Sequence, residues 1–419
     1  MKRANGGAPI KAAAVHPRTT GVRVDVGDEW LTLSTSAMSA RIAVDFDGAM
    51  DETDTGPDYK GPAAPAVHTF CWFIDAAMSA EELPDPTASD VIVVRPGDDL
   101  AKVNASELSA TAWQTVVFAP GVHRALNPGQ FKQTVLWQAP RTRYFLCAGS
   151  VVHAALIAGS NAGQKWGASS FVIDGFGVLS GEDMERTGSS AATTARGSGL
   201  SASLDKGGNS SPQGITWAGV VNSSMSGVTL VDFPNHHLIL GGGSKNGFNE
   251  LHGVKILGWR ANGDGLHVFQ NWHVSDLFMR TQGTSALTIT RAHILCTPPA
   301  IDAISRFSAD CSHSSSRHHA APRPPHRACV RALLCTYSCA DDSMYLDSGG
   351  GTATTFDRVT TWNDANGCAF IYSAGGGDTS TNVLRDSTAI YARASWAWWS
   401  GGRIFGLRQT STGRVMVRC

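Results

Sequence analysis

Three aspartates lie in segments whose composition suits acid–base chemistry. Asp264 belongs to the run Asn262-Gly-Asp-Gly265, and the pair Asp341 and Asp342 follows later in the chain. Carboxyl groups held close together can hydrolyse a glycosidic bond, because crowded like charges raise one pKa and keep that carboxyl protonated near neutral pH. Aspartate beside glycine also commonly builds turns, and a lone Asn-Gly-Asp-Gly is more often structural than functional.

Aromatic and polar residues surround these aspartates in the sequence. Aromatic rings stack on the apolar faces of sugars, and polar side chains hydrogen-bond to the hydroxyl groups. The pattern predicts a carbohydrate site, with core packing as the alternative for about half of the aromatic residues. The candidate substrate-binding residues are Trp259, Asn262, His267, Trp272, Tyr345 and Trp362.

The elements that would position these residues are short β-strands. Only 16% of the 419 residues are charged and 45 are glycine, a composition typical of β structure with many turns. Short apolar segments begin at Val228, Val254 and Val274, with spacings of 26 and 20 residues. One short strand on each side of a turn, repeated at this period, predicts a parallel β-helix over residues 111–419. An irregular sandwich is the alternative.

Residues 1–110 differ from the rest of the chain. Apolar and polar residues alternate in the short segments 22–26, 30–33 and 40–45, which indicates half-buried antiparallel strands. We therefore expect an all-β protein, with a reduced N-terminal β-sandwich in residues 1–110 followed by the parallel β-helix.

Residues 283–340 break the strand pattern. They hold five of the nine cysteines and five of the 14 histidines, without the paired spacings of a zinc site. The segment has 58 residues, a whole number of codons, and the codons available at its two ends permit an intron boundary. Without it, Asp264 and Asp341 are 19 positions apart, about one coil. The segment is therefore a candidate translated intron, with a surface insertion as the alternative.

Composition excludes several classes of partner. The net charge of −1 and the lack of a dense basic stripe argue against nucleic-acid binding. No run of 18 apolar residues is present, which argues against a membrane-spanning helix. Residues 1–16 show no continuous apolar core, so no clear signal peptide is visible. Carboxylates suffice for the expected chemistry, so we expect no cofactor and no metal, and a monomer acting on polysaccharide.

The motifs in combination resemble glycoside hydrolase family 49, which contains the dextranases and isopullulanase. The resemblance covers about residues 65 to 407 without 283–340, and is carried by the runs 171–182, 254–266, 271–282, 341–346 and 391–405. It implies an N-terminal β-sandwich, a right-handed parallel β-helix and hydrolysis of α-glucan with inversion. By resemblance, Asp341 is the general acid, Asp264 and Asp342 activate the water, and the protein is extracellular.

Other interpretations stay open at this stage. The related pectinase family shares the fold, but its Gly-His-Gly and Arg-Ile-Lys motifs are missing here, which argues against a galacturonan substrate. A catalytically inactive carbohydrate-binding β-helix, a faulty gene model of a hydrolase, and an adhesin-like structural β-helix are the alternatives to an active enzyme.

Overall fold

A computed structural model describes about half of the chain. The described residues are 10–16, 21–27, 31–36, 40–46, 69–103, 108, 112–124, 135–159, 170–184, 213–234, 236–242, 248–258, 265–268, 272–281, 344–348, 354–362, 370–374, 381–390, 405–409 and 414–418. Within these ranges the regular structure is β-strand, apart from the short 3-10 helix η4 (Leu100–Val103), and no helix there is long and apolar enough to cross a membrane.

Most of the described strands form three long sheets, named here sheets I, II and III. Sheet I contains β6 (Val91–Val94), β7 (Gln114–Phe118), β10 (Thr142–Leu146), β13 (Phe171–Gly175), β16 (Ser224–Ser226), β19 (Asn249–His252), β22 (Trp272–Ser275), β25 (Thr355–Asp357), β28 (Thr381–Arg385) and β31 (Arg414–Arg418). Sheet II contains β8 (Gly121–His123), β11 (Ser150–Val152), β14 (Val178–Ser180), β17 (Thr229–Val231), β20 (Lys255–Leu257), β23 (Phe278–Arg280), β26 (Thr360–Trp362) and β29 (Thr388–Ile390). Sheet III contains β9 (Val135–Trp137), β12 (Ala155–Gly159), β15 (Ile215–Val220), β18 (Leu238–Gly242), β21 (Leu266–Val268), β24 (Met344–Ser348), β27 (Phe370–Ala374) and β30 (Phe405–Gln409).

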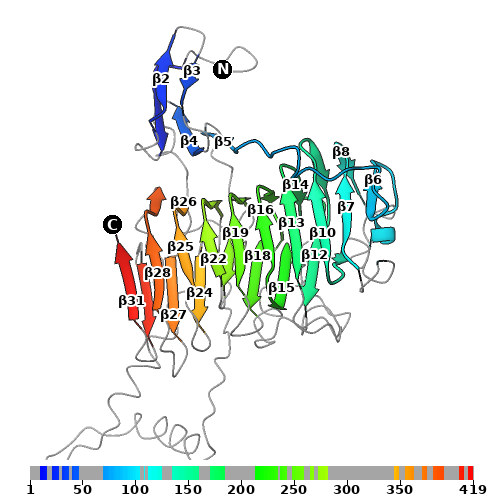
Figure 1. Cartoon of the computed structure of the whole chain (residues 1–419). Coiled ribbons are helices and arrows are strands. Elements are labelled where there is room, and N and C mark those ends of the chain that lie inside the picture. Colours follow the sequence, from blue (N-terminus) through cyan, green and yellow to red (C-terminus); the bar gives the residue numbers. More distant parts are fainter. Residues whose placement is uncertain are drawn as a thin grey trace, which may run out of the picture.

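The chain visits the three sheets in turn, and each visit adds one coil to a right-handed parallel β-helix. Coil 1 consists of β7, β8 and β9, coil 2 of β10, β11 and β12, and the described strands continue in this way to coil 8. Each strand pairs in parallel with the equivalent strand of the next coil, so the strands lie side by side along the axis (Figure 1). The fold class expected from the sequence is confirmed.

The corner between sheets I and II is a two-residue turn repeated along the helix. Its first residue has a positive φ, between 50° and 73°, at five positions: Gly227, Gly253, Asp276, Arg358 and Asp386. Glycine adopts this conformation without strain, and aspartate tolerates it better than most residues. The second residue is buried and apolar in four of these turns: Val228, Val254, Leu277 and Val359. Each turn therefore both redirects the chain and fills the core.

These corners show that the three apolar positions used to predict the repeat are not all equivalent. Val228 and Val254 occupy equivalent corner positions, but their counterpart in the next coil is Leu277, because Thr229, Lys255 and Phe278 are register partners. Val274 lies one strand earlier, in sheet I. The repeat itself is as expected, but one of the three apolar positions used to measure it belongs to another sheet.

The strands on either side of residues 283–340 belong to neighbouring coils. β22 pairs with β25, β23 with β26 and β21 with β24, each in parallel. The segment lies in the connection between β23 and β24, within coil 6. Removing it leaves five residues there, against eight between β20 and β21 and seven between β26 and β27. The expectation that these coils are adjacent is confirmed.

The described N-terminal strands are antiparallel, as the alternation predicts. β1 (Ala13–His16), β4 (Ala40–Phe46) and β5 (Thr69–Ile74) form one small sheet, and β2 (Arg23–Val26) pairs with β3 (Leu31–Ser34). After β5 the chain runs back along the helix to β6, which already pairs in parallel with β7 (Figure 1). The β-helix therefore begins at β6, within residues 1–110.

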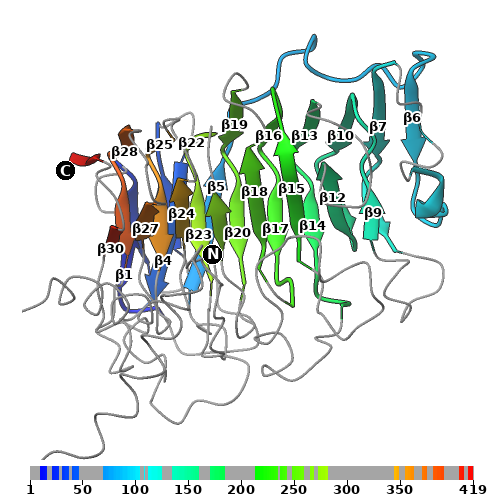
Figure 2. The same ribbon diagram turned by 90° about the horizontal axis from the view of Figure 1, so that it is seen from below.

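The small sheet packs against sheet II beside coils 5 and 6 (Figure 2). Phe73 on β5 meets Phe278 on β23 edge to face, with ring centroids 5.0 Å apart. Lys255 Nζ donates to Asp75 Oδ2 at 2.9 Å, and Arg41 donates to Asp75 and to the Gly253 carbonyl oxygen. Burial lowers the pKa of Lys255 despite its contact with Asp75. The interface between the small sheet and sheet II therefore combines apolar packing with a cluster of largely buried charges.

Candidate functional site

The three candidate catalytic aspartates and two of the candidate binding residues lie outside the described residues. These five are Trp259, Asn262, Asp264, Asp341 and Asp342. The strands that follow them, β21 and β24, are described, and they define where the two chain segments enter sheet III. Both segments belong to connections from sheet II to sheet III, in coils 5 and 6.

The pairing of β21 with β24 relates these two segments. Leu266 is the register partner of Met344, and His267 is the partner of Tyr345. Asp264 precedes Leu266 by two residues and Asp342 precedes Met344 by two residues. Equivalent positions on neighbouring coils are about 4.8 Å apart. The points at which the two connections enter β21 and β24 are therefore neighbours on one edge of sheet III.

His267 lies on the outer face of sheet III at this edge. Leu266 and Val268 point into the core and are fully buried, which leaves the intervening His267 on the outside. The ring of His236, from the preceding coil, lies 4.4 Å from the ring of His267, centroid to centroid, with the planes 35° apart. The structure thus brings one predicted site residue against a histidine that is not among the candidate site residues.

His236 was missed because its partner comes from the next coil. The run Asn235-His236-His237 carries no spacing that distinguishes it from a polar turn. The feature that could have identified His236 is its place in the connection between β17 and β18. The equivalent connection of the next coil holds Asp264. That position becomes visible only once the coils are aligned in register.

His237 supports the chain just before residues 259–264. Its ring is fully buried and packs against Gly258, where an added Cβ would lie 2.3 Å from the His237 Cε1. The Gly258 N–H donates to the carbonyl oxygen of Arg280 on the next coil, at 2.8 Å. Any side chain at position 258 would displace either the ring or this hydrogen bond. Glycine therefore holds the entrance to the candidate segment close to its neighbours.

Trp272 does not line the site, which corrects its assignment as a substrate-binding residue. Its side chain is fully buried inside the helix, where it stacks on Trp217 with ring centroids 6.1 Å apart and an interplanar angle of 29°. Trp217 in turn lies 6.2 Å from the ring of Phe171. β22 starts with an inward position, so that Trp272 and Val274 both fill the core. For Tyr345 and Trp362 the structure describes only the backbone, in β24 and β26.

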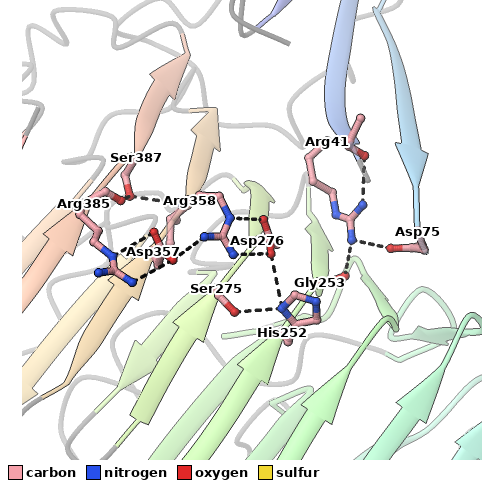
Figure 3. A network of polar contacts seen from close by, with 12 residues as sticks. Arg41, Asp75, His252, Gly253, Ser275, Asp276, Asp357, Arg358, Arg385 and Ser387 are labelled. Carbon is pink, nitrogen blue, oxygen red and sulfur yellow. Dashed lines mark hydrogen bonds and ion pairs between the residues drawn. The ribbon is translucent and has the colours of Figure 1, made fainter. Parts of the chain in front are cut away.

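A charge network at the corner between sheets I and II ties coils 5, 6, 7 and 8 together (Figure 3). Arg358 donates from Nε and Nη2 to the two carboxylate oxygens of Asp276, both at 2.8 Å. The His252 ring and Ser275 lie on the same network, with Nδ1 2.9 Å from Oγ. Asp357 contacts both Arg358 and Arg385. The bidentate pair joins coil 6 to coil 7.

The electrostatics of this network follow from partial burial. Burial raises the pKa of Asp276, but hydrogen bonds and attraction from Arg358 outweigh it, with smaller effects from His252 and Arg41. The pKa of Asp276 is therefore lowered, and its carboxylate stays ionised at neutral pH. No group of three or more histidine, cysteine, aspartate or glutamate residues in the described ranges has the geometry of a metal site.

Comparison with known proteins supports the fold. No protein-family model matches the sequence, and no curated protein matches it. Among solved structures, Dex49A from Penicillium minioluteum superposes with a TM-score of 0.53 at 12% sequence identity, covering 98% of this chain and 62% of Dex49A. This chain therefore spans less than two thirds of that protein. A family 28 exopolygalacturonase from Yersinia enterocolitica superposes with a TM-score of 0.35 at 11% identity, covering 96% of this chain and 75% of that one.

Proposed function

We propose that this chain is an inverting endo-glycoside hydrolase that cleaves α-glucan, with dextran-like α-1,6 linkages as the main substrate and pullulan as the second candidate. The shared fold with Dex49A supports a glycosidase, and the resemblance to family 49 supports the choice of an α-glucan. On the same resemblance we propose that it acts outside the cell as a monomer, without a cofactor.

The observation that carries the proposal is the register of β21 and β24. Asp264 and Asp342 each stand two residues before a pair of directly opposed strand residues, Leu266 and Met344. The strands pair although the 58-residue segment 283–340, which breaks the strand pattern of the sequence, lies between the two aspartates. This register supports a common edge for the segment of Asp264 and that of Asp341 and Asp342, and inverting hydrolysis needs an acid on one side of the bond and a base on the other.

In the proposed reaction, Asp341 donates its proton to the glycosidic oxygen as the bond to the anomeric carbon breaks. Asp264 and Asp342 activate a water molecule on the opposite face: one carboxylate accepts its proton and the other holds it by a hydrogen bond, while its oxygen attacks the anomeric carbon and inverts it. Inverting enzymes keep the acid and the base about 6.5–9.5 Å apart, which leaves room for that water. His267, half-buried on the outer face of sheet III, would contact the sugar beside the cleaved bond.

The test is release of reducing sugar from dextran and from pullulan. We expect Asp341→Asn to lower kcat by at least about a thousandfold while polysaccharide binding persists, because the amide cannot donate the proton. Proton NMR of the first product should show the inverted anomer. Wild-type activity by folded Asp341→Asn protein would refute the acid role, and no release by folded wild-type protein would refute the hydrolase.

One observation favours a second candidate, a faulty gene model of such a hydrolase. The three sheets continue in register across residues 283–340, because the strands before the segment pair in parallel with those after it. Transcript reads across the region decide between the two candidates. Reads that skip the segment support a retained intron, and uninterrupted reads in most transcripts show that it belongs to the protein.

A further inference from the structure

A polar cluster lies on the edge between sheets II and III, in the first three coils. Arg124 follows β8, His153 follows β11 and Asp183 lies shortly after β14, so that each of the three comes from a different coil. They meet at one point because the coils stack in register, although 59 residues separate the first from the last. None of the candidate site residues belongs to this cluster.

The cluster is organised around one carboxylate oxygen. Asp183 Oδ2 accepts from Arg124 Nε at 2.6 Å and lies 3.0 Å from His153 Nδ1. The His153 side chain is only 8% exposed, whereas Asp183 and Arg124 are 43% and 55% exposed. A nearly buried imidazole thus lies against the carboxylate of Asp183, which pairs with Arg124 at the solvent-exposed side of the cluster.

The charges of the cluster select the chemistry of a ligand. Burial lowers the pKa of His153, in spite of the attraction of Asp183 and Glu182, so that the imidazole is uncharged at neutral pH. Two carboxylates, Asp183 and Glu182, and the single guanidinium of Arg124 then act on this uncharged imidazole, and the excess of negative charge disfavours an anion. Arginine only donates hydrogen bonds and carboxylate only accepts them. A pair of sugar hydroxyls, each both donor and acceptor, suits this combination.

The position of the cluster relates it to the candidate catalytic segments. All of them lie on the same edge, between sheets II and III. Asp183 belongs to coil 3, whereas residues 259–264 belong to coil 5 and residues 341–343 to coil 6. At about 4.8 Å per coil, the cluster lies roughly 10–14 Å along the axis from the coils that carry the aspartates. A polysaccharide lying along this edge would pass both places.

We propose that Arg124, His153 and Asp183 form a distal subsite for an uncharged α-glucan chain, with Arg124 and Asp183 contacting hydroxyl groups and His153 positioning the carboxylate. This proposal rests on the proposed function, since it assigns the same polysaccharide to a second place on the same edge. It assigns to coils 1–3 the binding of chain units remote from the cleaved bond.

The experiment compares Asp183→Asn with wild-type protein on α-1,6-linked glucose oligomers of two lengths. Oligomers of about three units reach only the candidate catalytic coils, and oligomers of about eight units extend to coil 3, given the coil spacing. We expect the ratio of kcat/KM for the long over the short oligomer to fall about tenfold, since a hydrogen bond to a charged group is lost. Asp25→Asn, which breaks an exposed Arg23–Asp25 pair on the small N-terminal sheets, is the matched control and should leave the ratio unchanged.

An unchanged ratio in Asp183→Asn would overturn the subsite. Calorimetric titration of the long oligomer keeps the test independent of turnover. If wild-type protein cleaves neither oligomer, the proposed hydrolase is refuted. The subsite can still be tested, because it requires that the long oligomer bind and that Asp183→Asn weaken this binding about tenfold. Absent or equal binding in that case overturns the subsite as well.

Discussion

Deletion of residues 283–340 should stabilise the folded chain. β23 and β24 are now joined by 63 residues, and the deletion leaves five, close to the eight and seven of the equivalent connections in coils 5 and 7. The entropic cost of closing a flexible loop grows as 1.5 RT times the logarithm of its length, so the shorter connection gains about 2 kcal/mol. This gain requires that the segment contribute no packing of its own to the coils.

Equilibrium urea unfolding of the two proteins, followed by far-ultraviolet circular dichroism, measures the difference. A third variant, in which a Gly/Ser linker of equal length replaces the segment, separates length from sequence. We expect this variant to match the parent and the deletion to exceed both. A deletion that unfolds the protein, or a linker variant about 2 kcal/mol less stable than the parent, would refute the reasoning, because the segment would then supply native contacts.

Three further predictions concern the neighbouring coils. Asp276→Asn should lower stability by about 1 kcal/mol near pH 7, because it breaks the bidentate pair with Arg358. The pKa of Asp276 is lower in the folded than in the unfolded protein, so the difference in unfolding free energy between variant and wild type should shrink as pH falls below about 4. A difference in urea unfolding that does not change with pH would contradict this prediction. Gly258→Ala should cost roughly 1–3 kcal/mol through overlap with the buried His237 ring, and an unchanged thermal midpoint would show that the ring can move aside. Because the Trp272 side chain is in the core, Trp272→Ala should lower the free energy of unfolding by roughly 3–5 kcal/mol. Trp272→Phe should fold and bind polysaccharide as well as wild type. Selective loss of binding by folded Trp272→Phe would show that Trp272 belongs to the site.

The repeat was predictable from the sequence because a β-helix is periodic. Valine and leucine at coil-length spacing, with glycine or aspartate at the corners, mark the turns that redirect the chain, as at Gly253 and Val254. The same periodicity marks residues 283–340 as foreign, and the pairing of β21 with β24 agrees with their removal. Local composition carries this information, since the backbone of each coil pairs with that of its neighbours.

The orientation of individual side chains could not be predicted in the same way. A strand of three or four residues has few inward positions, so its apolar content does not determine which residues face the core. An aromatic residue such as Trp272 is therefore equally consistent, from sequence, with the core and with a binding surface. The phase is set by the corner turns, whose geometry depends on hydrogen bonds to the coils before and after. Leu277 rather than Val274 is the corner residue for this reason.

Contacts between distant residues depend on the tertiary structure, through the stacking of the coils and the packing of the small N-terminal sheet on sheet II. His236 meets His267, Arg124 meets Asp183, and Lys255 meets Asp75 across 180 residues, without any spacing in the sequence that signals them. Composition and periodicity thus specify that the chain coils, how often it turns and which segment fits no coil. Which polar groups face one another follows from register, because each coil displaces the next by one strand spacing and brings remote residues to a common edge.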